Sequence, residues 1–461
     1  MTQLVRVALL GSGPAAFYAA EHLFRQVGLN LEVDMFDRLP TPFGLVRGGV
    51  APDHPKIKAV TKLYDHIAAD PRFRFYGNVD FGAHLTLADL RAHYHQIIYC
   101  TGAQTDRRLG IPGEGLRGSH PATEFVAWYN GHPDYAHLQF DLTQERAAVI
   151  GVGNVAIDVA RMLCRTPEEL GTTDIADYAL EALSHSRIKE VYLIGRRGPL
   201  QAAFSNPEIK EVGEMADAEP IILPDEAELD DLSRAALATS ADRADQKKVE
   251  ILQGYARRPP TGQARRLHIR FLASPTEIIG NEAGQVTTLR LVKNVLVATE
   301  GGSLNAKTTD QLEELPVGLV FRSVGYRGVP LPDVPFHDRW GVILNEQGRV
   351  LDPETKQPRV GEYCAGWIKR GPSGVIGTNK PDAAETAHHM LEDAAQGRLL
   401  QPVQPEAQCV IDLLRQRQPH YFTFADWQKL DEIEVARGHA LGRPRVKFTS
   451  VTEMLAALGR A

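Results

Sequence analysis

Cysteine is scarce in this chain and widely spaced. Only Cys100, Cys164, Cys364 and Cys409 occur, and no two of them form a Cys-x-x-Cys pair. This spacing argues against a zinc site, an iron–sulfur cluster and a local redox dithiol, so we predict no metal site. It also argues against a disulfide framework and therefore favours a reducing, cytoplasmic location.

Long apolar runs and a surplus of basic residues are missing as well. No run of about twenty apolar residues occurs, so we expect no membrane span. The formal net charge of −7 argues against a nucleic-acid interface, which needs a basic face. The chain enters an apolar stretch at Leu4 without the basic segment of a signal peptide or an Arg-rich transit segment. Its 461 residues exceed what one hydrophobic core spans, which predicts two or more domains.

A strand, a glycine-rich turn and a helix are predicted at the N-terminus. Apolar residues 5–10 indicate a buried parallel strand, and helical periodicity runs to residue 24 after the turn. The turn residues are Gly11, Gly13, Pro14 and Ala16. The first glycine permits a tight turn, the second lets the backbone approach a pyrophosphate, and the small alanine lets helix and strand pack closely. The next predicted strand ends in Asp37, whose carboxylate can accept hydrogen bonds from ribose hydroxyls.

The same order of elements returns in the middle of the chain. The turn residues after the apolar stretch 147–150 are Gly151, Gly153 and Ala156. The following strand, 191–194, comes late, because residues 166–190 intervene as a predicted helical extension with a short second helix. That strand ends at Arg196 and Arg197 instead of at an acid.

The two strand ends therefore predict two different cofactors. A carboxylate at the second strand end would repel a 2′-phosphate, whereas guanidinium groups bind phosphate with several charge-assisted hydrogen bonds. We interpret Arg196 and Arg197 as a site for NADP(H), and Asp37 as part of a site for tightly bound FAD. The alternative is a solvated turn that carries two surface arginines.

Two further segments are rich in glycine and proline. Residues 39–58 predict an ordered loop, in which His54 lies either on the surface or at the flavin edge. Residues 362–394 predict a short strand, a loop with four glycines and a helix that begins near Pro381. A helix N-terminus behind such a loop suits the negative charge of a reduced flavin ring. A plain connection between strand and helix is the alternative.

At this point the chain resembles the adrenodoxin reductase branch of ferredoxin–NADP reductases, which is built like glutathione reductase. The matching segments include GSGPAAFYAA, PTPFGLVRGGVAPDHPKIK, GVGNVAIDVARML, GRRGPLQAAF and GWIKRGPSGVIGTNK, and they extend from the N-terminus to beyond residue 380. The resemblance implies an α/β fold with two Rossmann-like dinucleotide-binding domains. An NADP domain of residues 106–321 would be inserted into an FAD domain of residues 1–105 and 322–461.

The resemblance also implies the residues of both sites. The FAD site would be lined by Ala15, Asp37, Leu45, Val79, Trp367, Gly374, Val375 and Ile376. The NADP site would be lined by Asn154, Val155, Ala156, Ile157, Arg196, Arg197 and Glu208, with Arg107 near the pyrophosphate and Gly374 near the nicotinamide. His54 and Glu211 would orient groups or handle protons. Relatives commonly carry Glu where this chain has Asp37, and the shorter acid still reaches a ribose. No residue between 215 and 260 is carried over, because that region shows little pattern.

The implied activity is that of an FAD-containing NADPH:ferredoxin or NADPH:flavodoxin oxidoreductase, working as a monomer or a weak dimer. A hydride would pass from NADPH to N5 of FAD, and single electrons would then pass to a small iron–sulfur protein, which could supply a cytochrome P450 or another oxygenase. A flavin monooxygenase-like enzyme and the reductase subunit of a larger complex remain alternatives. A disulfide reductase is excluded by the missing cysteine pair. A basic cluster could dock an acidic partner, although we favour solvated surface charge; it comprises Arg257, Arg258, Arg265, Arg266 and Arg270.

Overall fold

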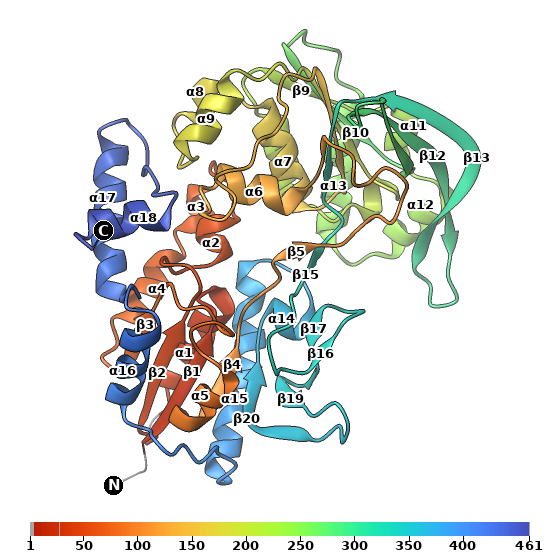
Figure 1. Ribbon diagram of the computed structural model, residues 1–461. Coiled ribbons are helices and arrows are strands. Elements are labelled where there is room, and N and C mark those ends of the chain that lie inside the picture. Colours follow the sequence, from red (N-terminus) through yellow and green to blue (C-terminus); the bar gives the residue numbers. More distant parts are fainter. Residues whose placement is uncertain (1–3, 27, 461) are drawn as a thin grey trace. The chain divides into compact units, whose positions relative to one another are not determined.

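The computed structural model describes residues 4–26 and 28–460 and divides into two compact units (Figure 1). The first unit comprises residues 1–105, 130–133 and 326–461. The second comprises residues 106–129 and 134–325, so its sequence is inserted into that of the first. Each unit contains a sheet of mostly or wholly parallel strands, which confirms the predicted α/β class with two Rossmann-like sheets.

The sheet of the first unit has seven strands in the order β18-β19-β20-β4-β1-β2-β3. Its strands are β1 (Val5–Leu10), β2 (Leu31–Phe36), β3 (Phe73–Tyr76), β4 (Gln96–Tyr99), β18 (Asn345–Glu346), β19 (Arg349–Leu351) and β20 (Pro358–Cys364). The five strands from β20 to β3 are parallel, and β18 and β19 extend the sheet antiparallel. Every residue of β1 is buried, as its unbroken apolar sequence predicts for a central parallel strand.

Two helices from opposite ends of the chain pack together in this unit: α1 (Pro14–Phe24) and α15 (Asn379–Ala395). Ala16, Ala20, Ala383 and Ala387 are fully buried in one hydrophobic cluster, and their small side chains let the two helices approach closely. The other helices are α2 (Leu45–Gly48), α3 (Pro55–Lys58), α4 (Thr61–Ala68), α5 (Leu87–His93), α14 (Trp367–Arg370), the 3₁₀ turn Ile376–Thr378, α16 (Ala407–Arg417), α17 (Phe424–His439) and α18 (Val451–Ala457). Short strands form two small ladders, β5 (Thr105–Asp106) with β15 (Tyr326–Arg327) and β16 (Phe336–His337) with β17 (Val342–Ile343).

The second unit is built on a six-stranded parallel sheet in the order β6-β14-β7-β8-β10-β9. Its strands are β6 (Ser119–Pro121), β7 (Arg146–Ile150), β8 (Glu190–Ile194), β9 (Ala218–Ile221), β10 (Arg265–Arg270) and β14 (Leu319–Arg322). Its helices are α6 (Ala122–Tyr129), α7 (Asn154–Cys164), α8 (Pro167–Leu170), α9 (Asp177–Ser184), the 3₁₀ turn Pro199–Gln201, α10 (Asn206–Val212), α11 (Pro224–Ala227), α12 (Asp231–Thr239) and α13 (Arg243–Ala256). The predicted helical insertion between β7 and β8 is thus the pair α8 and α9.

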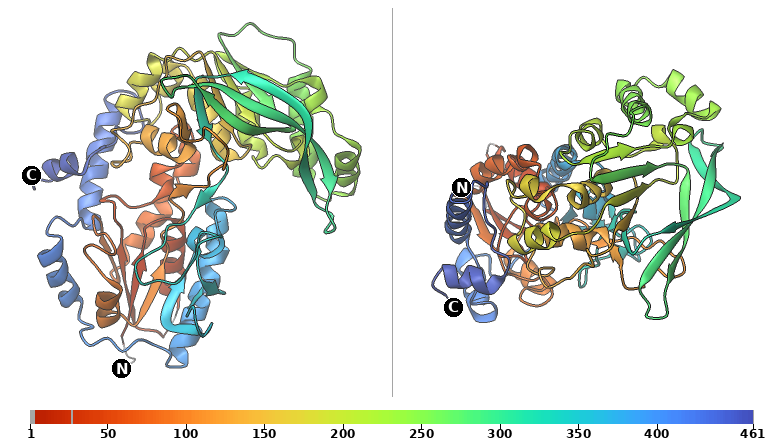
Figure 2. Two further views of the ribbon diagram at one scale, coloured as in Figure 1. Left: turned by 45° about the vertical axis from the view of Figure 1, so that its right-hand side comes forward. Right: turned by 90° about the horizontal axis from the view of Figure 1, so that it is seen from above.

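A three-stranded antiparallel sheet completes this unit: β11 (Ala273–Gly280), β12 (Val286–Ala298) and β13 (Leu304–Pro316). Figure 2 shows β12 and β13 as a long, twisted ribbon. The region 215–260, which showed little sequence pattern, contains one strand of the parallel sheet and three helices. Its helices α11 and α12 are short and polar, so hydrophobic periodicity gave little signal.

Charged side chains form ion pairs between the neighbouring strands β1, β2 and β3, next to the first glycine turn. Asp34 on β2 is fully buried and pairs with Arg6 on β1, which is also buried. The Oδ2 atom that pairs with Arg6 also accepts from the hydroxyl of Tyr94 at 2.6 Å, and Oδ1 accepts from Arg74 Nε on β3 at 2.6 Å. These bonds hold in place the strand whose end carries Asp37.

Replacing Asp34 with alanine should lower the free energy of unfolding by about 3–5 kcal/mol, because the buried Arg6 would keep only the more distant carboxylate of Glu32, 3.8 Å away, and the Pro405 carbonyl. Urea unfolding followed by circular dichroism measures the loss. Asp412→Ala is the control, since the side chains of Asp412 and Arg415 form an ion pair while 61% and 65% exposed. That change should cost less than about 1 kcal/mol, and similar losses in both variants would contradict the prediction.

Candidate functional site

The two glycines of the first turn differ in what surrounds them. Gly11 has φ +99°, and a Cβ there would lie 2.5 Å from the carbonyl oxygen of Cys100, so the fold itself requires glycine. Gly13 has an ordinary φ of −80°, and a Cβ would meet no described atom within 4 Å. Packing within the protein therefore does not explain why residue 13 is a glycine. Space for a ligand against the backbone would explain it, as the motif predicts.

The second turn repeats this division. Gly151 has φ +134°, and a Cβ there would collide with the carbonyl of Ser323. Gly153 has φ −102° and, among the described residues, open space around the position of a Cβ. No side chain caps the N-terminus of α1 or α7, so backbone N–H groups in both first turns are available to an anion.

Asp37 follows β2 directly and is bound to the first glycine turn. Its Oδ2 accepts from the backbone N–H of Ser12 at 2.8 Å and from the Ser12 hydroxyl at 2.5 Å. Its Oδ1 accepts from the N–H of Leu39 at 2.8 Å. Burial raises the pKa of Asp37, although these hydrogen bonds lower it. A carboxylate offers about four acceptor positions, so one is left for a ribose hydroxyl.

Ser12 was not predicted as a site residue, although it lies inside the motif between the two glycines. The N–H of Val79, which is 2% exposed, donates to the carbonyl of Asp37 at 2.9 Å. The structure thus brings Val79 and Asp37 to the same strand end as the glycine turn.

The loop of residues 39–58 lies against the same turn. Phe43 N–H donates to the Ser12 carbonyl at 3.0 Å, and Phe43 has φ +85°, a strained value for a non-glycine residue. A Cβ on Gly44 would lie 3.0 Å from the Cα of Gly13. The half-exposed Leu45 then begins α2. His54 is the N-cap residue directly before α3 and is only 7% exposed, so it is not a surface histidine.

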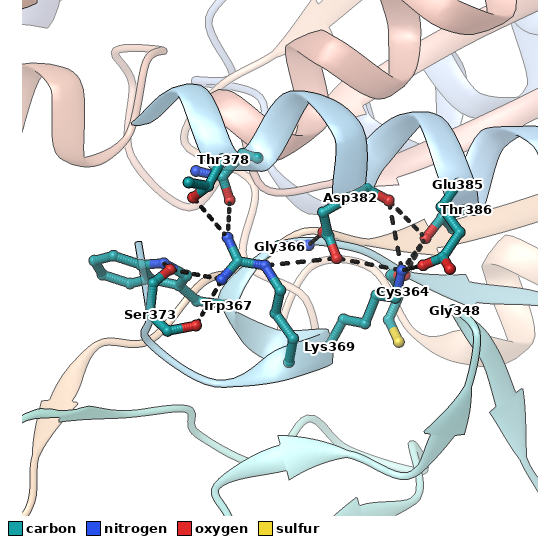
Figure 3. A network of polar contacts seen from close by, with 12 residues as sticks. Gly348, Cys364, Gly366, Trp367, Lys369, Ser373, Thr378, Asp382, Glu385 and Thr386 are labelled. Carbon is teal, nitrogen blue, oxygen red and sulfur yellow. Dashed lines mark hydrogen bonds and ion pairs between the residues drawn. The ribbon is translucent and has the colours of Figure 1, made fainter. Parts of the chain in front are cut away.

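The glycine-rich loop after β20 meets the first turn from the other end of the sequence. A Cβ on Gly366 would lie 2.7 Å from the Cβ of Ala15. The Gly366 N–H donates to Asp382 Oδ2 at 2.5 Å, and Asp382 Oδ1 lies 3.2 Å from Lys369 Nζ (Figure 3). The indole N–H of Trp367 donates to the carbonyl of Ser373 at 3.1 Å. Asp382 therefore anchors the start of this loop to the first turn of α15.

One detail of this segment corrects the sequence prediction. Residues 367–370 form the short helix α14, which overlaps the start of the expected loop. Helix α15 begins at Asn379, two residues before Pro381 and so near it, as predicted, and the proline in its first turn removes an N–H that has no partner within the helix. Gly374, Val375 and Ile376 immediately precede this N-terminus, and Val375 is 56% exposed. The exposed side chain of Val375 offers an apolar contact for a planar ring, and the positive end of the helix dipole beside it would stabilise negative charge on that ring.

Arg196 and Arg197 follow β8, as predicted. Arg196 is exposed and Arg197 is half-buried, and neither guanidinium has an ion pair with any residue that the structure describes. Burial and then the charge of Arg196 lower the pKa of Arg197. By contrast, nearby Arg266 pairs with Glu190, and Arg270 pairs with Glu226 and Glu313. The uncompensated pair fits a phosphate, whereas two of the five arginines of the basic cluster are already paired with glutamates.

The predicted residues Glu208 and Glu211 lie on α10 and share one cation. Arg161 on α7 is fully buried, and its Nη1 lies 3.0 Å from Glu208 Oε2 and 2.9 Å from Glu211 Oε2. Asn154, at the start of α7, accepts from the N–H of Ser205 at 2.8 Å. These contacts bring α10 to the second glycine turn, to which Val155, Ala156 and Ile157 also belong. Arg107 is exposed, and its N–H donates to the Gly325 carbonyl at 2.9 Å.

All four cysteines are free thiols. Burial raises the pKa of Cys100, Cys164 and Cys364, which disfavours the thiolate form that redox chemistry needs. No helix among residues 4–26 and 28–460 has the length and apolarity required to cross a bilayer.

Alanine at position 13 should leave the fold intact and weaken flavin binding, because its Cβ enters space that a pyrophosphate would need. The change at a helix N-cap should cost at most about 1 kcal/mol of stability, while flavin affinity should fall by about 1–3 kcal/mol. Fluorescence titration of the apoprotein with FAD measures the second effect. Gly11→Ala is the matched variant and should lower the melting temperature of the apoprotein itself. Equal melting temperatures for the two variants would count against this division of roles.

Comparisons with known proteins agree with this geometry. The family model described as pyridine nucleotide-disulphide oxidoreductase matches residues 5–216. NADPH-ferredoxin reductase FprA of Mycobacterium tuberculosis is 47% identical over 97% of this chain and 98% of its own, and human mitochondrial NADPH:adrenodoxin oxidoreductase is 40% identical over 98% and 92%. A solved structure of M. tuberculosis FprA in complex with NADPH superimposes with a TM-score of 0.93 and 46% identity, covering 99% of this chain and all of that one. The chain therefore belongs to the adrenodoxin reductase-like family of ferredoxin–NADP reductases.

Proposed function

We propose that this chain is an FAD-containing NADPH:ferredoxin oxidoreductase, with flavodoxin as an alternative acceptor. The observation that carries the proposal is the full-length similarity, at 47% identity, to a protein named NADPH-ferredoxin reductase. The human relative is also named for NADPH as the donor, with adrenodoxin as the acceptor.

We assign FAD to the first unit and NADP(H) to the second. In the first unit, Gly13 leaves room for a pyrophosphate and Asp37 keeps one acceptor position for a ribose hydroxyl. In the second unit, Gly153 leaves the same room, and Arg196 and Arg197 supply positive charge for a 2′-phosphate. When bound, FAD supplies acceptance of a hydride at N5 and delivery of single electrons.

The protein's part in this chemistry is binding and electrostatics. The positive end of α15 and the N–H groups of its first turn would stabilise negative charge on a ring that rests against Val375. Asp382 keeps that loop in place through Gly366. Positioning of this kind accounts for most of the rate in a hydride transfer, which needs no general base.

For His54 and Glu211 we propose roles in orienting the nicotinamide. His54 is buried at the start of α3, where packing restricts its ring. The carboxylate of Glu211 is directed by the Arg161 guanidinium, 2.9 Å away. A side chain held in this way can align a substrate without exchanging a proton.

We further propose that the acceptor is a small iron–sulfur protein or a flavodoxin, and that the enzyme is cytoplasmic and either monomeric or weakly dimeric. The free thiols support the location. The basic cluster gives little support for docking of an acidic partner, because two of its five arginines, Arg266 and Arg270, are already paired with glutamates.

Anaerobic reduction of a bacterial ferredoxin by NADPH, coupled to cytochrome c as the final acceptor, tests the activity. We expect flavin to copurify with the protein, and ferredoxin to be required for fast cytochrome c reduction. A protein without flavin, or a rate that ferredoxin does not increase, would refute the proposal.

Replacing Arg196 or Arg197 with alanine should weaken the binding of NADPH far more than the binding of NADH. Each charge-assisted hydrogen bond to phosphate that is lost costs about 1.5–3 kcal/mol, or about tenfold to a hundredfold in affinity. Stopped-flow reduction of the bound flavin gives half-saturating concentrations for both nucleotides. Arg257→Ala, which removes an equal charge from the end of α13, should change neither value. Equal losses for NADPH and NADH in the Arg196 and Arg197 variants would mean that the pair is structural.

A further inference from the structure

The backbone turn that carries Arg196 and Arg197 is held by its carbonyl groups. The N–H of Ala273 donates to the carbonyl of Gly195 at 3.0 Å, and the N–H of Leu272 donates to that of Arg197 at 3.1 Å. The carbonyl between them, on Arg196, accepts from the side-chain amide of Asn294 at 2.8 Å. Two of the three carbonyls are therefore held by main-chain donors, and only the middle one depends on a particular side chain.

Asn294 is placed for this contact by an irregularity in β12. The register of β12 against β13 shifts between Val292 and Asn294, and such a shift re-aims the side chain that follows it. Asn294 is only 1% exposed, and its amide also donates to Ser274 Oγ at 2.8 Å. A carbonyl can only accept, so the amide nitrogen must face Arg196.

The Oδ1 atom of Asn294 is buried and has no hydrogen-bond partner among the residues described. Burying a polar atom without a partner is destabilising, so an apolar residue would be the more stable choice for this position considered alone. The two hydrogen bonds that the amide donates explain why an asparagine is found at this position. One of them is accepted by the carbonyl of Arg196, in the turn that carries the two arginines.

The backbone conformation of Leu272 is a second observation that links this turn to a ligand site. It is a non-glycine residue with φ +54°, a strained conformation for a leucine. Its N–H holds Arg197, and its carbonyl accepts from the N–H of Asn294 at 2.7 Å. Strained residues that their surroundings hold in place gather at ligand sites. Leu272 thus joins the turn to Asn294 through main-chain bonds.

We propose that Asn294 is a positioning residue for the 2′-phosphate site, because it fixes the backbone from which the two guanidinium groups project. The proposal rests on the assignment of Arg196 and Arg197 to NADP(H). The two cations repel each other and have no carboxylate partner among the residues described, so a turn free to relax would let them separate. With the turn fixed, both charges stay available to one phosphate. Asn294 acts through that backbone and not by touching the cofactor.

Asn294→Leu tests this role, because leucine has the same branched skeleton of four side-chain heavy atoms, although it is bulkier, and cannot donate to the Arg196 carbonyl. We expect the half-saturating NADPH concentration in flavin reduction to rise about threefold to tenfold, the effect of one neutral hydrogen bond. The value for NADH and the limiting rate with either nucleotide should not change. Ser274→Ala is the matched control, since it removes the other partner of the same amide and leaves the bond to Arg196. It should behave like the unmodified protein.

A coupling measurement separates this inference from the proposed function. In an Arg196→Ala, Arg197→Ala background, Asn294→Leu should add no further loss of NADPH affinity, since the groups it positions are gone. If the arginine variants lose NADPH selectivity and Asn294→Leu does not, the positioning role is overturned and the proposed function stands. If the arginine variants keep their selectivity, the assignment of the phosphate site itself fails.

Loss of folding must be distinguished from loss of selectivity. Melting temperature and flavin content report on the fold of each variant, and Asn294→Ala removes the same donor without requiring space if leucine is not accommodated. If binding of NADPH and of NADH weakens equally in the variant that folds, the role of Asn294 is merely structural and the proposal is overturned.

Discussion

Both units depend on one constraint: a helix that begins directly after a glycine turn leaves its first N–H groups without partners. Neither α1 nor α7 has a side chain that caps this end. An anion can satisfy those groups and also benefits from the helix dipole, so such a turn is suited to bind an anion. The rest of each unit fits this requirement. Parallel strands bring the carboxyl ends of further strands to the same edge of the sheet. Small residues next to the turn let the helix and the strand come close enough for the turn to form.

What distinguishes the two sites is the chemistry at the end of the next strand. After β2, a single carboxylate is bound to the turn by Ser12 and keeps one acceptor position. After β8, the exposed Arg196 and the half-buried Arg197 have no carboxylate partner among the residues that the structure describes. The backbone geometry of the two turns is otherwise alike, since in each the first glycine is required by packing and the second is not. Under the proposed assignment, a few side chains at the strand ends are enough to distinguish two different nucleotides on two copies of one architecture.

Much of this arrangement could be predicted from the sequence, because it rests on local signals. The glycine turns, the long buried strands and the position of Arg196 and Arg197 follow from periodicity and spacing within a few dozen residues. The contacts that fix the sites could not be predicted. Ser12 on Asp37, Asp382 on Gly366 and Asn294 on Arg196 join segments whose proximity is decided by tertiary packing. The short, polar helices between residues 215 and 260 lack a strong hydrophobic period, and α14 forms in a sequence that reads as a loop.

The insertion of one unit into the sequence of the other has a consequence for synthesis on the ribosome. Strand β20 pairs with β4, and the loop at Gly366 packs on Ala15, so the first unit needs segments from both ends of the chain. The second unit is complete in sequence by residue 325. It can therefore fold while the first still lacks strand β20 and the loop at Gly366. Contacts this distant in sequence form slowly, so we expect the proposed flavin site to be completed after the second unit, with the edge of β4 unpaired until β20 is made.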